Sequence, residues 1–105
     1  MKKKMKKKIN AGDNINTENA NWKFSGKTAK NFDIHINKSV PLYKWTHDLG
    51  LNFSDFFLSK PCNVYDLGCS TGKFLKSLRS RNKEKNINFY GVDEIKDMCK
   101  IAKKN

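Results

Sequence analysis

The sequence has few of the features that mark secreted or membrane proteins. Its three cysteines, Cys62, Cys69 and Cys99, form no C-x-x-C pair and no metal-binding spacing. An odd number of cysteines, with no secretory signal, predicts reduced thiols. No apolar run approaches the length of a membrane span, and the lysines at the start are not followed by a hydrophobic stretch. We therefore expect a cytoplasmic protein with no membrane partner and no metal site.

Arginine is almost absent, although the chain is strongly basic. The formal net charge is +12, yet only Arg79 and Arg81 are arginines. Arginine is the side chain best suited to bidentate phosphate contacts. Six of the positive charges are lysines near the start, namely Lys2, Lys3, Lys4, Lys6, Lys7 and Lys8. A codon bias toward lysine and asparagine explains this composition as well as RNA binding by the lysine-rich head does, and that binding stays open as an alternative.

Composition divides the chain into three parts. Residues 1–20 combine lysine and asparagine with almost no apolar side chains, so we expect a disordered tail. Residues 21–60 contain the first large apolar residues and form an N-terminal cap segment and helix. Residues 61–105 alternate strand-like and helix-like patterns. The whole chain of 105 residues has room for about two strands and three helices.

The helix predicted in the middle part has an aromatic stripe. From Leu42 to Phe57, apolar residues recur at steps near three and four, which indicates an amphipathic helix. Ser39 is expected to cap its start. We expect the stripe to pack against a sheet as core.

The stretch NVYDLGCSTG, residues 63–72, predicts a buried strand, a glycine turn and the start of a helix. The strand formers stop at Gly68, Ser70 and Thr71 can cap a helix, and helical spacing follows Gly72. The turn does not fit a P-loop, which needs four residues between its glycines, because only three separate Gly68 from Gly72. It does not fit G-x-G-x-x-G either, which would need a glycine at the position of Ser70. A ligand-free glycine turn is the plainer alternative.

A second strand, expected near residues 87–92, ends at Asp93. A strand–helix–strand unit of this kind gives two parallel strands, and ligands bind at their carboxyl ends. A carboxylate at this point can accept hydrogen bonds from both hydroxyls of a ribose. Glu94 is its neighbour and could contact the same nucleoside. The plainer alternative is that Asp93 only caps the next helix.

These two motifs together resemble a known family. Asp66-Leu67-Gly68-Cys69-Ser70-Thr71-Gly72 resembles motif I, D-x-G-x-G-x-G, of the class I S-adenosylmethionine-dependent methyltransferases, with Ser70 in place of the middle glycine. Gly91-Val92-Asp93 resembles the acidic motif of that family. The chain is most similar to the carboxy-S-adenosylmethionine synthase group, and the resemblance runs from about Trp22 to the last residue.

The resemblance implies an α/β fold, the first half of a Rossmann-like methyltransferase fold. An N-terminal helix would be followed by strand–helix–strand–helix with parallel strands. The implied cofactor is S-adenosylmethionine or its carboxylated derivative. The residues that would bind it are Tyr43, Asp66, Gly68, Cys69, Ser70, Gly72, Asp93 and Glu94. The backbone of the Gly68–Ser70 turn would hold the methionine end, and Tyr43 belongs to a segment that folds over the cofactor in that family.

Three functions stay open at this point. The chain can be the cofactor-binding portion of a methyltransferase with an unknown acceptor, part of a carboxy-S-adenosylmethionine synthase serving tRNA wobble-uridine modification, or a non-enzymatic RNA-binding module. A complete methyltransferase domain is about twice this length or more. We therefore expect a missing C-terminal half or a homo-oligomer to complete the fold, with catalytic and acceptor-side residues outside this chain.

Overall fold

The computed structural model describes residues 17–18, 21–58, 61–83 and 86–105. Its elements are β1 (Thr17–Glu18), β2 (Asn21–Trp22), α1 (Lys27–Ser39), α2 (Tyr43–Phe57), β3 (Cys62–Leu67), α3 (Lys73–Arg81), β4 (Ile87–Val92) and α4 (Lys96–Ala102). The disordered tail predicted for residues 1–20 lies outside the described residues, apart from β1. That short strand pairs with β2 in antiparallel fashion.

The strands β3 and β4 form a parallel pair joined by α3, as the sequence predicts. Their register runs from Cys62 opposite Ile87 to Leu67 opposite Val92. Both strands therefore end side by side, next to the glycine turn and Asp93. The α/β class and the strand–helix–strand–helix order are confirmed.

The two faces of this strand pair differ in exposure. On β3, half-buried and exposed residues alternate, and Val64 and Asp66 lie on the half-buried face. Tyr65 lies on the opposite, exposed face, where its ring stacks on Tyr90 of β4 at 5.0 Å between ring centroids. Alternation with a period of two places every second side chain on the same face, so the helices cover one face and leave the other open.

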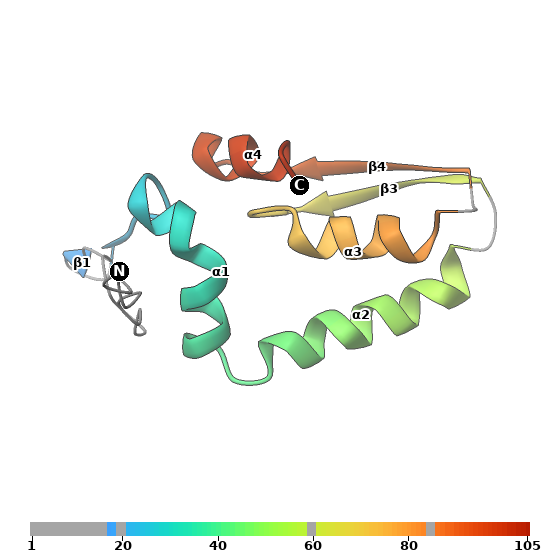
Figure 1. The fold of residues 1–105 in the computed structure, drawn as a ribbon, viewed down its shortest axis with the longest axis horizontal. Helices are drawn as coiled ribbons and strands as arrows, with labels where there is room; N and C mark the ends of the chain where they lie inside the picture. The colour runs from blue at the N-terminus through green and yellow to red at the C-terminus, as the bar shows by residue number, and fades with distance from the viewer. Residues whose placement is uncertain (1–16, 19–20, 59–60, 84–85) are drawn as a thin grey trace, which may run out of the picture.

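The helices form layers below the strands (Figure 1). The helix α3 lies under the strand pair, α2 lies on the far side of α3, and α1 stands at the end of the sheet toward which both strands point. Gly50 of α2 allows close packing, because a Cβ there would lie 2.9 Å from Cζ of Phe74 on α3. A small core is formed by Ala29, Cys69, Leu78 and Met98.

The aromatic stripe of α2 does not form the core that we expected. No residue of α2 is buried, and Trp45 is 73% exposed while Phe56 is 80% exposed. The helix contacts α3 and α1, whereas the strands lie beyond α3. The helical period was predicted correctly, but the packing partner was wrong, because α3 occupies the space against the sheet.

Helix starts also differ from the prediction. Ser39 is the last residue of α1 and does not cap α2, which begins after Leu42 in a left-handed conformation with φ of 61°. Gly72, with φ of 73°, precedes α3, and no side chain hydrogen-bonds the start of that helix. The side chains of Ser70 and Thr71 therefore do not cap α3, although their residue types favour that role. None of the described helices combines the length and the apolar character needed to cross a bilayer.

Candidate functional site

The turn between β3 and α3 contains three residues in the left-handed region. These are Gly68 with φ of 82°, Ser70 with φ of 50° and Gly72 with φ of 73°. Glycine adopts this region readily, whereas other residues do so at a cost. Ser70 thus takes the backbone conformation for which the usual motif has glycine. Such strained residues cluster at functional sites.

The backbone of this turn is tied to the end of β4. The N–H groups of Gly68 and Cys69 both donate to the carbonyl oxygen of Val92, at 2.7 and 3.0 Å. The N–H of Ser70 donates to Oδ2 of Asp93 at 2.8 Å. Gly68 and Asp93 therefore lie at one site. The three N–H groups that we expected to hold a ligand already donate within the chain.

The carboxylate of Asp93 has capacity for further hydrogen bonds. Its Oδ1 accepts from the N–H of Ile95 at 2.8 Å, which satisfies a donor at the start of α4. An ionised carboxylate offers about four lone-pair positions. The bonds from the N–H groups of Ser70 and Ile95 occupy two of them. Asp93 can therefore support the turn and the helix start while it accepts bonds from a ribose.

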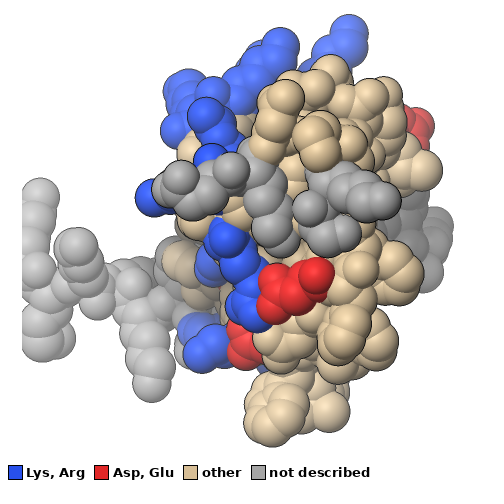
Figure 2. Space-filling model, turned by 90° about the vertical axis from the view of Figure 1, so that its right-hand side faces the viewer, with Lys and Arg blue, Asp and Glu red and all other residues tan. Residues whose placement is uncertain are grey.

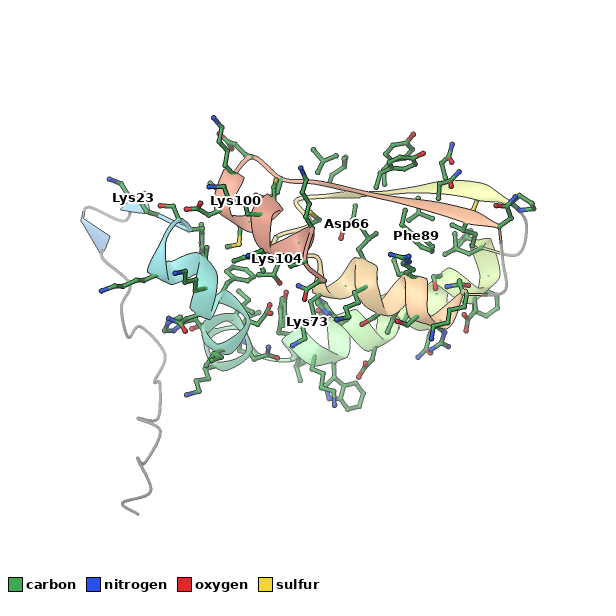
Figure 3. The ribbon with its side chains drawn as sticks, turned by 45° about the horizontal axis from the view of Figure 1, so that its top comes forward. Lys23, Asp66, Lys73, Phe89, Lys100 and Lys104 are labelled. Atoms are coloured by element: carbon green, nitrogen blue, oxygen red, sulfur yellow. The ribbon has the colours of Figure 1, made fainter. Side chains whose placement is uncertain are left out.

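A pocket of about 200 Å³ opens beside the turn. Its lining comes from α2, the end of β3, the turn and the start of α3, and consists of Tyr43, Thr46, His47, Asp66, Gly68, Cys69, Ser70, Thr71, Lys73 and Phe74. Figure 3 shows Asp66 on the helix side of the strand pair and Lys73 on the first turn of α3. The pocket brings together residues that lie far apart in the sequence.

Five of the eight residues expected to bind a cofactor line this pocket, namely Tyr43, Asp66, Gly68, Cys69 and Ser70. Asp93 adjoins it through its bond to Ser70. Gly72 is buried on the other side of the turn, where a Cβ would lie 2.9 Å from Cβ of Ala102. Glu94 is exposed and does not line the pocket.

Electrostatic effects in the pocket follow from burial among acidic groups. Burial, with a smaller contribution from Asp93, raises the pKa of Asp66 against the opposing effect of His47. Burial and the charges of Asp33 and Asp66 raise the pKa of Tyr43, so its hydroxyl stays protonated and can donate. Burial and the same kind of acidic neighbours raise the pKa of Cys69. A thiol of this kind is a poor nucleophile, and Cys69 acts as a small side chain that packs against Gly91.

One hydrogen bond joins α1 to the turn, and another joins Gly26, which precedes α1, to α4. The hydroxyl of Thr71 donates to Oδ1 of Asp33 at 2.8 Å, and the N–H of Gly26 donates to Oδ2 of Asp97 at 2.9 Å. Asp33 therefore brings a further carboxylate to the motif I turn. Sequence reasoning missed Asp33, because nothing in the local pattern marks this half-buried carboxylate as part of a site.

His47 lines the pocket, and sequence reasoning missed it as well. Its ring lies 4.5 Å from the ring of Tyr43 and 5.1 Å from that of Phe74, between centroids. Burial, and then the charge of Lys73, lowers its pKa, although Asp66, Asp33 and Asp48 act in the opposite direction. Its position four residues after Tyr43 was the available signal, since such residues share a helix face.

A larger hollow of about 900 Å³ lies on the other side of the turn. It is lined by α3, β4 and α4, including Leu75, Phe89 and Cys99. Asp66 and Tyr43 do not reach it. Within the described part of the chain, no group of three or more His, Cys, Asp and Glu is placed to hold a metal ion. Of the residues expected to bind a cofactor, Cys69 and Gly72 line this hollow, whereas Tyr43, Asp66 and Gly68 line the smaller pocket.

The fold and the pocket together define the class. A parallel strand pair, a left-handed glycine turn and an acidic residue at the second strand end are the arrangement by which α/β folds bind a nucleotide-like ligand at the carboxyl ends of their strands. No family model matches the chain. Comparison with curated proteins nevertheless shows that the chain is homologous to part of the carboxy-S-adenosyl-L-methionine synthases.

Three of these relatives show how far the similarity extends. The synthase of Staphylococcus epidermidis is 40% identical over 82 residues, which is 77% of this chain and 36% of the relative. The synthase of Nautilia profundicola is 38% identical over 82 residues, or 78% of this chain and 34% of the relative. That of Campylobacter hominis is 35% identical over 83 residues, or 79% and 35%. The chain thus spans about a third of the length of the curated relatives it matches.

Proposed function

We propose that this chain binds S-adenosylmethionine, or its carboxylated derivative, as the cofactor-binding portion of a carboxy-S-adenosylmethionine synthase. The observation that carries the proposal is the bond from the Ser70 N–H to Asp93. It places the motif I turn and the acidic strand end at one site, beside the pocket that contains Tyr43 and Asp66. The homology to the synthases supports the same cofactor.

The charge of the site supports a cationic ligand. The chain has a net charge of +12, yet Asp33, Asp66 and Asp93 are gathered around one turn. S-adenosylmethionine, which has a sulfonium group, an ammonium group and one carboxylate, carries one net positive charge. Carboxylates near a positive ligand favour its binding. The site is therefore suited to this ligand in a chain whose overall charge would repel it.

The size of the pocket indicates which end of the ligand it takes. Pockets for whole drug-sized ligands enclose roughly 300–1,000 Å³, more than the volume of about 200 Å³ here. We therefore place the amino-acid end in the pocket and the ribose at Asp93. Gly68 lies between them, and a Cβ there would meet no atom within 4 Å, so a ligand can approach the backbone closely.

The residues of the pocket have complementary tasks in this arrangement. Asp66 and the carbonyl oxygen of Gly68 can accept hydrogen bonds from the ligand ammonium group. Tyr43 presents a ring and a hydroxyl, which can close the pocket and donate at the same time. When bound, S-adenosylmethionine supplies an activated sulfonium group. The contribution of this chain is to orient the ligand and exclude water from it.

Two other functions are tested against this one. A methyltransferase with a different acceptor would bind the same cofactor without preferring the carboxylated derivative. RNA binding is favoured only by cationic side chains, which form a band down the face shown in Figure 2. That view looks at the end of the molecule away from the tips of β3 and β4. A role in tRNA wobble-uridine modification stays part of the proposal.

Isothermal titration of the full chain with S-adenosylmethionine and with its carboxylated derivative tests the proposal. We expect binding of at least one, tighter for the carboxylated form if the chain is part of a synthase. Asp93→Ala should abolish it, and Glu94→Gln tests the neighbouring predicted contact. No heat with either ligand, on protein shown to be folded by circular dichroism, would overturn the proposal. A steep dependence of RNA affinity on salt would favour the RNA-binding alternative.

A further inference from the structure

The pocket beside the motif I turn contains basic groups as well as acidic ones. Asp66 is its carboxylate, whereas His47 and Lys73 bring two basic side chains to its lining. The amino-acid end of the proposed ligand also has both signs of charge, an ammonium group and a carboxylate. Asp66 can serve the ammonium group, so the question is which groups serve the carboxylate.

Three backbone donors of the turn are already used. The N–H groups of Gly68, Cys69 and Ser70 donate to Val92 and Asp93. The hydroxyl groups of Thr46, Ser70 and Thr71, which line the pocket, also donate within the chain. Thr46 donates to the carbonyl oxygen of Tyr43, Ser70 to that of Gly68, and Thr71 to Asp33. The side chains of the lining left to donate to a ligand carboxylate are therefore the hydroxyl of Tyr43, the imidazole N–H of His47 and the ammonium group of Lys73, which is the charged one.

The position of His47 suits this role. Its ring is held between the rings of Tyr43 and Phe74. Among the described residues, neither ring nitrogen of His47 has a hydrogen-bond partner. Lys73 is close enough to affect the titration of this imidazole. Two neighbouring donors directed at one pocket match the two oxygens of a carboxylate.

The start of α3 also favours a negatively charged group in the pocket. Lys73 is the first residue of this nine-residue helix, and Phe74 is the second. The first N–H groups of a helix have no partner within it, and the helix dipole favours negative charge there. Both residues line the pocket. The helix start therefore favours an anion in the pocket that His47 and Lys73 both line.

We propose that His47 and Lys73 together bind the α-carboxylate of the ligand's amino-acid end, while Asp66 binds its ammonium group. This assignment rests on the proposed function, because it concerns the same pocket. It makes His47 and Lys73 specificity-determining residues. They distinguish an amino-acid ligand from a nucleoside that lacks the carboxylate.

Decarboxylated S-adenosylmethionine is the probe that separates this assignment from the proposed function. It keeps the adenosine, the sulfonium and the amine but lacks the α-carboxylate. We expect the wild-type chain to bind S-adenosylmethionine about ten- to a hundredfold more tightly than this probe in isothermal titration, as for a charge-assisted pair. In Lys73→Met and in His47→Phe, which keeps the aromatic contacts, the ratio should fall toward one.

Lys76→Met is the matched control. Lys76 lies on α3, is exposed and faces the larger hollow instead of the pocket. The wild-type ratio should survive in this variant. Equal affinity of the wild-type chain for both ligands would overturn the assignment and leave the proposed function standing. Equal losses for both ligands in Lys73→Met, or the same effect in Lys76→Met, would also overturn it. Absence of binding by either ligand would instead overturn the proposed function.

Discussion

The backbone N–H of Ser70 lies 2.8 Å from Oδ2 of Asp93, and this bond joins the turn after β3 to the end of β4. The other oxygen of Asp93 accepts from Ile95 at the start of α4. One side chain thus holds a strained turn, a strand end and a helix start in position. The first prediction follows from this double role.

Asp93→Ala should lower the free energy of unfolding by about 1–3 kcal/mol, because two buried or half-buried N–H groups lose a charged acceptor. Asp93→Asn should cost less, since its amide oxygen can still accept one of the two bonds. Urea titration followed by circular dichroism measures both. The exposed neighbour Glu94 is the control, and Glu94→Gln should change stability by no more than about 0.5 kcal/mol. Equal stability of Asp93→Ala and wild type would contradict the double role.

Gly68 and Gly72 form a matched pair for a second prediction. Both have positive φ, so alanine at either position is strained, at a cost of about 1 kcal/mol. At Gly72 the new Cβ would also meet Cβ of Ala102 at 2.9 Å and its Cα at 3.2 Å, whereas at Gly68 it meets nothing within 4 Å. Thermal unfolding should therefore give a clearly lower Tm for Gly72→Ala than for Gly68→Ala.

The two glycine variants should rank in the opposite order when the loss of ligand affinity is measured instead of the loss of stability. Gly68 lines the pocket and Gly72 does not. Among chains that stay folded, Gly68→Ala should weaken the binding of S-adenosylmethionine more strongly. If Gly68→Ala binds as well as the wild type, the ligand does not approach this backbone.

The third prediction concerns the pH dependence that His47 gives to stability. Its pKa in the folded chain is lowered from 6.5, by burial first and then by Lys73. The unfolded chain therefore binds more protons as the pH falls below that value, and the free energy of unfolding falls with it. The carboxylates of Asp66, Asp33 and Asp48 oppose the shift without reversing it.

His47→Phe should remove this part of the pH dependence. Urea titrations between about pH 8 and pH 5 should give a flatter stability profile for the variant than for the wild type, with the two curves diverging below the ordinary pKa of histidine. Parallel curves across that range would show that His47 titrates in the folded chain as it does in the unfolded one.

The fourth prediction separates helical periodicity from burial. Trp45 of α2 is 73% exposed, whereas Leu78 of α3 is 4% exposed. Trp45→Ala should therefore change stability by less than about 1 kcal/mol, while Leu78→Ala should cost about 2–5 kcal/mol through lost burial and a cavity. Iodide quenching of Trp45 fluorescence, in a Trp22→Phe background, measures its exposure directly. A protected Trp45 would show that this face of α2 is covered in solution.

Much of the strand–turn–helix–strand unit could be predicted because its signals are local. Val64, Gly68 and Gly72 indicate a strand, a turn and a helix start within a short stretch of sequence. Asp93 follows the second strand directly, so parallel pairing alone was enough to place it beside the turn. For these residues, backbone preference and position in the sheet lead to the same answer.

Contacts made across long stretches of sequence were decided only by the tertiary structure. Asp33 meets Thr71, and His47 meets Phe74, through the packing of α1 and α2, which no local pattern specifies. The alignment of the ends of β3 and β4 determined that the turn's N–H groups donate to Val92 and Asp93 instead of to a ligand. Helix packing also left the apolar face of α2 exposed, because periodicity states which side chains share a face but not what covers it. The sequence by itself thus determined the order of the elements and the turn, and tertiary packing decided which side chains complete the pocket.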